Sequence, residues 1–104
     1  LARTAATLGA GAPAQALLGR LLVERGEYES ALPILGGAIS SLPASGPAQY
    51  SLAVAHARLG HEAEAKGSFE RALAAGGLTS AQRAHAEQAV QRHDAAAAAE
   101  GRTY

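Results

Sequence analysis

The sequence predicts an all-α protein in which antiparallel helix-turn-helix repeats stack on one another, with a capping helix at the C-terminal end. Three observations predict this fold. Apolar residues recur at intervals of three and four along most of the chain, as on one face of a helix. Glycines and prolines interrupt these stretches at short intervals. One pattern of residues also returns 34 positions later, a period typical of stacked helix pairs.

The two copies of this pattern can be aligned on their glycines and prolines. Gly60 follows Gly26 by 34 residues, and Pro47 follows Pro13 by the same interval. The small and apolar positions after each glycine correspond as well: Ala31, Leu35, Ala38 and Ile39 in the first copy, and Ala65, Phe69, Ala72 and Leu73 in the second. Each copy is therefore expected to hold two helices joined by a glycine turn.

The chain before the first copy, residues 1–12, is predicted to be the tail of a preceding repeat. Its segment LARTAATL has a helical composition and is followed by Gly9 and Gly11, which end helices well. The chain opens at Leu1 and has no methionine, so we expect a trimmed piece of a longer protein.

The first repeat is assigned to residues 13–46. Pro13 suits the first position of a helix that runs to about Arg25, and the partner helix is expected over residues 28–41. Within this second helix, Pro33 is placed near the first turn, where proline is tolerated. The pair Gly36 and Gly37 has three interpretations: close helix contact, local slack or a hinge.

The second repeat is assigned to residues 47–78, with helices over about 47–59 and 61–75. Thr79 followed by Gln82 is a capping-box pattern that predicts the start of a last helix, assigned to residues 79–99. This helix is more polar than the others, as the open end of a stacked array requires. Residues 100–104 are expected to be a polar tail.

The predicted core depends on few large residues, because alanine is abundant and aromatics are scarce. Small residues are expected where neighbouring helices cross, at Gly19, Ala31, Ala38, Ala53, Ala65 and Ala72. The larger core residues are expected to be Leu8, Leu17, Leu18, Leu21, Leu22, Tyr28, Leu32, Leu35, Ile39, Leu52, Leu59, Phe69 and Leu73.

Composition narrows the function classes. Nine basic residues balance nine acidic ones, so no net field attracts nucleic acid or an anionic membrane. There is no cysteine, and no apolar run approaches the length of a membrane span. The expectation is a soluble protein, cytoplasmic or periplasmic, with the compartment left open. Abundant alanine and more arginine than lysine suggest a GC-rich bacterial source.

The residues at the repeating positions resemble the tetratricopeptide repeat. The family pattern appears in the first copy as Leu18, Gly19, Gly26, Tyr28, Ala31, Ala38 and Pro43, and in the second as Leu52, Leu59, Gly60, Ala65, Phe69 and Ala72. The second copy departs from the pattern at Ala53, at His56, where a large aromatic is usual, and at Gly77, which replaces the closing proline. The resemblance extends from Pro13 to about Gly77.

The resemblance implies that the helix pairs stack in a right-handed superhelix, whose concave groove takes an extended or helical peptide. Its lining, carried over to this chain, would be Ala16, Arg20, Val23, Tyr50, Val54, Arg58, Ala84, Gln88, Gln91 and Arg92. The arginines would suit a partner with acidic side chains or a terminal carboxylate, although solvated arginines are the alternative. A clamp for chaperone carboxylates is not expected, because its lysine and asparagine positions hold Ala16, Arg20 and Ser51.

The titratable residues offer little for catalysis, and no catalytic, cofactor or metal site is predicted. His61 with Glu62 and Glu64 lacks the second histidine of an HExxH site, and His85 and His93 lie about two turns apart. His56 is interpreted as a packed histidine in an aromatic position. The first hypothesis is therefore a scaffold or adaptor that binds a protein partner. The alternative is an assembly module that self-associates, as a homo-oligomer, or docks through its N-terminal helix edge; an enzyme is the third.

Overall fold

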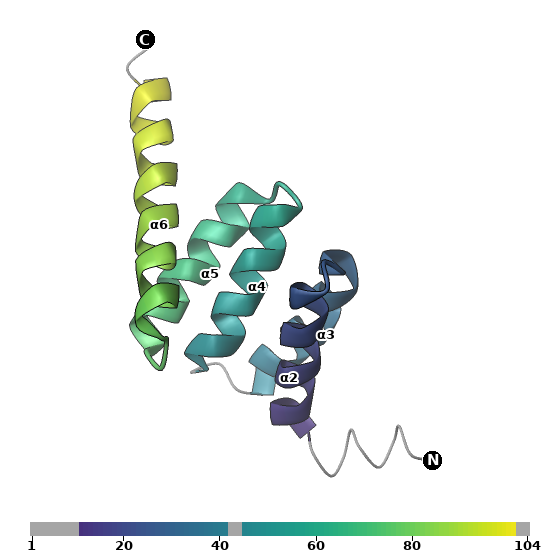
Figure 1. The fold of residues 1–104 in the computed structure, drawn as a ribbon. Coiled ribbons are helices and arrows are strands. Elements are labelled where there is room, and N and C mark those ends of the chain that lie inside the picture. Colours follow the sequence, from purple (N-terminus) through teal and green to yellow (C-terminus); the bar gives the residue numbers. More distant parts are fainter. Residues whose placement is uncertain (1–10, 42–44, 102–104) are drawn as a thin grey trace.

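The computed structural model describes residues 11–41 and 45–101, with the side chains of Ala12 and residues 96–101 left out. The described residues form five helices and no strand, which confirms the all-α prediction (Figure 1). The helices are α2 (Gly11–Glu24), α3 (Tyr28–Ser41), α4 (Gly46–Arg58), α5 (Glu62–Ala75) and α6 (Ser80–Gly101). Helices α2 and α3 pack as one pair, α4 and α5 as the next, and α6 packs against α5.

The two helix pairs turn through the same motif. Gly26 and Gly60 both have a φ of 83°, in the left-handed region that favours glycine. In each turn the amide after the glycine donates to a carbonyl five residues back, Glu27 to Leu22 and His61 to His56, both at 2.8 Å. The glycine amide donates to the carbonyl three residues back, which completes a Schellman motif. The 34-residue repeat is thus a repeat of turn geometry as well as of sequence.

The core is built from alanines around one large side chain in each pair. Leu35 of α3 and Phe69 of α5 are almost completely buried. The small residues predicted at the crossings are buried too, as expected. At Gly19 the fit is so close that an added Cβ would overlap the side chain of Leu35. Glycine at this position lets α2 and α3 approach each other.

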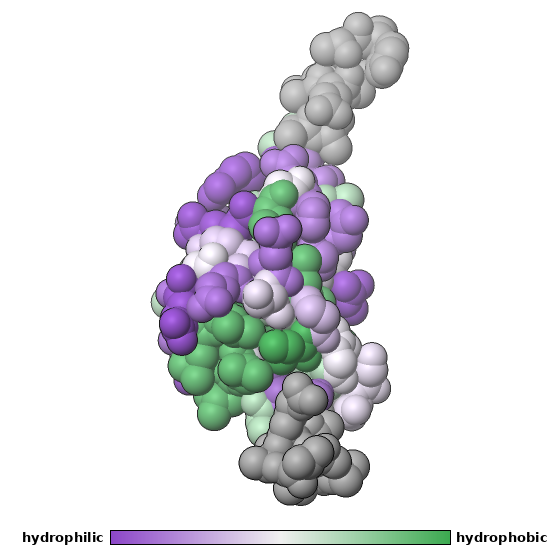
Figure 2. Space-filling view, turned by 90° about the vertical axis from the view of Figure 1, so that its right-hand side faces the viewer, coloured by the Kyte–Doolittle hydropathy of each residue, from purple (hydrophilic) through white to green (hydrophobic). Residues whose placement is uncertain are grey.

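Three of the predicted core leucines are instead exposed, and that prediction was wrong for them. Leu17, Leu18 and Leu21 of α2 expose 51%, 48% and 42% of their surface. Figure 2 shows apolar side chains gathered on this end of the molecule. The reason is position in the stack, because α4 has α3 packed on its preceding side whereas no helix among the described residues precedes α2. The other predicted core residues that are described are buried or partly buried, and Leu8 lies outside the described residues.

Helix α3 carries the proline and the glycine pair. Pro33 is the sixth residue of α3 and lies in the second turn, one turn later than predicted, so the Glu29 carbonyl lacks its usual helical donor. Both residues are exposed, so water can bind that carbonyl. An added Cβ would meet nothing within 4 Å at Gly36 and only a side-chain atom of Gln15, at 3.6 Å, at Gly37. The glycine pair is therefore loosely packed against its surroundings and is not a point of close helix contact.

The start of α4 and the end of α5 are in close backbone contact at Gly46. A Cβ at this position would overlap the carbonyl oxygen of Gly76, which follows α5. The start of α4 is also capped, since the Ser45 hydroxyl accepts a hydrogen bond from the Ala48 amide at 3.3 Å. The segments on either side of the second helix pair are thus held in contact by their main chains.

Helix α6 begins with the predicted capping box. The Thr79 amide donates to Gln82 Oε1 at 3.0 Å, and the Gln82 amide donates to Thr79 Oγ1 at 3.1 Å. The helix then continues through the alanine run to Gly101, two residues beyond the predicted end. Among the described residues, no helix is long and apolar enough to cross a membrane.

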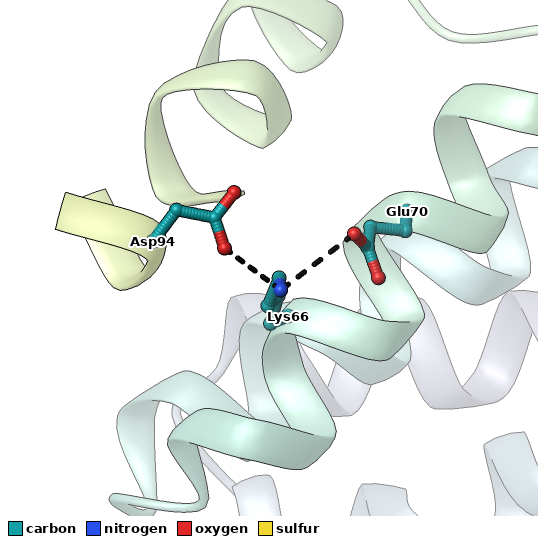
Figure 3. A network of polar contacts seen from close by, with 3 residues as sticks. All are labelled: Lys66, Glu70 and Asp94. Atoms are coloured by element: carbon teal, nitrogen blue, oxygen red, sulfur yellow. Dashed lines mark ion pairs between the residues drawn. The ribbon is translucent and has the colours of Figure 1, made fainter. Parts of the chain in front are cut away.

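An ion-pair network ties α6 to α5. Lys66 Nζ lies 2.7 Å from a carboxylate oxygen of Asp94 and 3.9 Å from one of Glu70 (Figure 3). The hydrogen bond to Asp94 raises the pKa of Lys66, and the charges of Asp94 and Glu70 act in the same direction. All three side chains are partly or largely exposed, so the network orients α6 more than it stabilises the fold.

Candidate interaction surface

An aromatic cluster joins α4, α5 and α6. The ring of Tyr50 lies edge-on to that of Phe69 at a centroid distance of 5.8 Å, and His85 contacts both rings, at 5.7 Å from Tyr50 and 5.3 Å from Phe69. The Tyr50 hydroxyl and His85 Nδ1 share a hydrogen bond of 2.6 Å. Burial raises the pKa of Tyr50, so the phenol stays protonated and can donate. Tyr50 is therefore held on two sides while remaining partly exposed.

Val54 continues this apolar surface along α4. Tyr50 and Val54 pack against a buried cluster of Ala53, Ala65, Phe69 and Ala86, beside the partly buried Leu73, Ala89 and Val90. Both remain partly exposed. Tyr50 and Val54, two of the predicted groove residues, thus lie together on the core formed by α4, α5 and α6.

Ala16 and Arg20 lie at a second place, between α2 and the start of α4. They line a shallow hollow of about 140 Å³ together with Leu17, Ser45, Pro47, Ala48 and Ser51. Arg20 is largely exposed, and its Nε lies 3.7 Å from a carboxylate oxygen of Glu24 in the next turn. Val23, farther along α2, is partly buried.

The remaining predicted residues have exposed side chains. These are Arg58 on α4 and Ala84, Gln88, Gln91 and Arg92 on α6. Within the described residues, neither Arg58 nor Arg92 makes an ion pair. Their guanidinium groups are therefore open to a ligand from outside this part of the chain.

The sequence pattern missed His85. The 34-residue period placed Ala84 opposite Tyr50, whereas the structure places the imidazole of His85 against the Tyr50 ring. Helix α6 begins at Ser80, 34 residues after the start of α4 at Gly46, so the period extends to this helix and the histidine that contacts Tyr50 lies one residue beyond the equivalent position. Equal spacing shows which positions are equivalent on successive helices, but it does not show which side chains of those helices meet.

The described residues hold few groups that could act in catalysis. Among the described residues, no group of three or more His, Asp or Glu side chains could form a metal cage. Ionisable groups that meet include the Lys66 network and the pair His56 and His61. The exposed and partly exposed residues of α2, α4 and α6 thus include apolar side chains, guanidinium groups and a fixed phenol, which are groups that suit binding.

Comparisons with known proteins agree with this arrangement. A family model described as tetratricopeptide repeat matches residues 22–87, more than half of the chain. Searches of curated proteins and of solved structures returned no match. Tetratricopeptide repeats are in general protein-protein interaction modules, and the family is typically non-catalytic. With two turns of the same geometry, alanines at the helix crossings and this match, the chain belongs to the tetratricopeptide repeat family.

Proposed function

We propose that this chain is a non-catalytic scaffold or adaptor module that binds an extended or helical segment of a partner protein across α2, α4 and α6. The observation that carries the proposal is the fixed, partly exposed Tyr50, which lies with Val54 over the core at the α4 and α6 end. In this proposal residues 13–46 and 47–78 are the two repeats, residues 79–99 are the cap, and the stack winds in a right-handed superhelix.

Tyr50 has the properties of a binding anchor. Its ring is supported by Phe69 and its hydroxyl by His85, so little conformational freedom is left to lose when a partner binds. Aromatic side chains in such supported positions often carry a large part of the binding energy of an interface. Val54 adds apolar area next to it, and Gln88 and Gln91 would supply polar contacts at the rim.

The arginines favour a partner with acidic groups. Arg20, Arg58 and Arg92 are exposed, and a guanidinium binds a carboxylate through two parallel hydrogen bonds. The pair between Arg20 and Glu24 is largely exposed and separated by 3.7 Å, so a ligand carboxylate could replace Glu24 at low cost. This preference is part of the proposal and is tested separately from the groove itself.

A peptide-array screen followed by titration of the hits tests the proposal in two stages. We expect Tyr50→Ala to weaken binding by about 2 kcal/mol, which is about thirtyfold in Kd. We expect Arg20→Ala, Arg58→Ala and Arg92→Ala to reduce binding of acidic peptides only. Arg25→Ala is the matched control, because Arg25 lies outside the proposed groove and its side chain is 75% exposed.

Each stage has an outcome that contradicts it. Hits that bind the Tyr50→Ala variant as tightly as the parent would refute the groove. Hits that ignore acidic residues, or that respond to Arg25→Ala as much as to Arg20→Ala, would refute the acidic preference and leave the groove in place.

A second candidate function, assembly through α2, is favoured by the exposure of Leu17, Leu18 and Leu21. Three neighbouring exposed leucines form an apolar patch that a helix of a partner, or of a second copy, could cover. Sedimentation over a concentration series tests this, with all three leucines changed to serine and with the exposed Ala74 and Ala81 changed to serine as the control. A parent chain that stays monomeric at all concentrations would count against self-association.

A further inference from the structure

The turn between α4 and α5 brings two histidines together. His56 lies in the last turn of α4 and His61 is the residue before α5. The hydrogen bond from the His61 amide to the His56 carbonyl, at 2.8 Å, fixes their backbones relative to each other. Their Nδ1 atoms are 3.1 Å apart, and the rings are tilted by 51° with their centroids 5.3 Å apart. Two imidazoles thus face each other across a rigid glycine turn.

We propose that His56 and His61 together bind one divalent transition-metal ion through their imidazole nitrogens. Imidazole is a common ligand for copper, nickel and zinc. Nitrogens 3.1 Å apart, each at the usual 2.0–2.1 Å from one Zn²⁺, subtend an angle of about 100° at the ion. That angle lies between the right angle of square or octahedral coordination and the tetrahedral value, so the separation suits all three metals.

The ion would replace the proton that the two nitrogens share in the metal-free protein. In the complex each Nδ1 would direct its lone pair at the ion. The two ligands differ in mobility, since His56 is partly buried against its neighbours and His61 is exposed. One ligand is thus held in place, and the other can move to admit the ion.

The surroundings set the expected affinity. Burial is the main cause of the lowered pKa of His56; His61 and Arg71 lower it further, and the Glu64 carboxylate opposes this. Glu64 would therefore favour a cation at this turn, whereas Arg71 would disfavour it. No group of three His, Asp or Glu side chains in the described ranges could hold an ion. Water must then fill the other positions, so the site is weak and exchangeable.

The spacing of the histidines along the chain gives a reason why the sequence pattern did not predict this site. The HExxH pattern pairs His61 with residues that follow it on one helix. The second ligand proposed here is His56, which lies before the turn. In the first repeat the corresponding residues are Leu22 and Glu27, which cannot form such a pair. The site belongs to the second repeat.

Calorimetric titration of the tag-free chain with CuCl₂, NiCl₂ and ZnCl₂ at pH 7.5 tests the proposal. We expect one ion per chain, with Cu²⁺ bound more tightly than Ni²⁺ and Zn²⁺, in line with the general order of divalent metals. His61→Gln and His56→Gln should each weaken Cu²⁺ binding at least tenfold. His85→Gln is the matched control and should leave it unchanged.

Circular dichroism of each variant shows whether the helices are retained, and His61→Gln is the decisive variant because His61 is exposed. The proposal is overturned if no metal binds at millimolar concentration, or if Cu²⁺ binds the His61→Gln chain as tightly as the parent. Loss of binding in the His85→Gln chain that equals the loss in His61→Gln would overturn it as well.

Discussion

The two helix pairs share one framework but present different surfaces. Both turn through a Schellman motif at a left-handed glycine, and both place alanines at the helix crossings. Around this framework the second pair has Phe69 where the first has Leu35, and Tyr50 where the first has Ala16. The positions of Leu17 and Leu21 are taken in α4 by Ser51 and Ala55, which are buried.

These differences separate the residues that build the repeat from those that make it bind. Glycine turns and alanine crossings set how the helices pack, and they recur. The side chains that vary between the copies give the α2 end an apolar patch and give the second pair an aromatic cluster and a histidine pair. The comparison therefore predicts different responses to equivalent substitutions in the two pairs.

The largest effect is expected from removing the buried Phe69 side chain of the second pair. Phe69→Ala should destabilise the protein by about 3–5 kcal/mol, because it empties a fully buried site. It should also free Tyr50 and His85, both of which contact the Phe69 ring. Leu35→Ala is the equivalent change in the first pair and should lower stability while leaving the near-ultraviolet signal of Tyr50 in place. Urea unfolding and circular dichroism measure both, and equal loss of the Tyr50 signal in the two variants would contradict this division.

A single methyl group at Gly46 should have the next largest effect. Gly46→Ala places a Cβ against the Gly76 carbonyl, and main chain cannot move aside as a side chain can. We expect a loss of about 3 kcal/mol, at the upper end of overpacking effects. Thermal melting measures it. If the Gly46→Ala chain had the same melting temperature as the parent, the packing of α4 against the end of α5 would not depend on this contact.

In the first pair, adding a methyl group should stabilise instead. Gly36→Ala meets nothing within 4 Å and removes a glycine from the middle of α3, so a gain of about 1 kcal/mol is expected. Gly26→Ala is the control, since its φ of 83° makes the same substitution unfavourable. A melting temperature for Gly36→Ala that falls below the parent value would show that the glycine pair has a role beyond slack.

The smallest effect is expected from pH, and only in the second pair. Burial lowers the pKa of His56 below its usual value near 6.5. The positive charges of His61 and Arg71 lower this pKa further, and the Glu64 carboxylate acts in the opposite direction. Between the usual pKa and the lower folded pKa, the unfolded chain binds a proton that the folded chain does not. His56 thus allows full stability above about pH 6.5 and reduces it as the pH falls below that value. His56→Phe should lessen the difference in melting temperature between pH 7.5 and pH 5.5, and an unchanged difference would exclude this role.

Much of the local structure could be read from the sequence, because its causes are local. Hydrophobic spacing and capping residues predicted the helix boundaries to within about two residues, and Thr79 with Gln82 forms the predicted capping box. Helix α3 begins at Tyr28 as predicted, and counting from that residue puts Pro33 sixth, in the second turn rather than the first. The alanine crossings followed from the repeat, whose period is itself a property of the chain.

Only the tertiary structure decided which surfaces are covered and which side chains meet. Helical spacing marks Leu17, Leu18 and Leu21 as an apolar face, but burial depends on whether another helix lies against that face. His85 meets Tyr50 because α4, α5 and α6 pack together, and His56 meets His61 because the glycine turn brings them together. Periodicity describes a helix and its neighbours in sequence, whereas a contact between helices depends on where each one begins and how they cross.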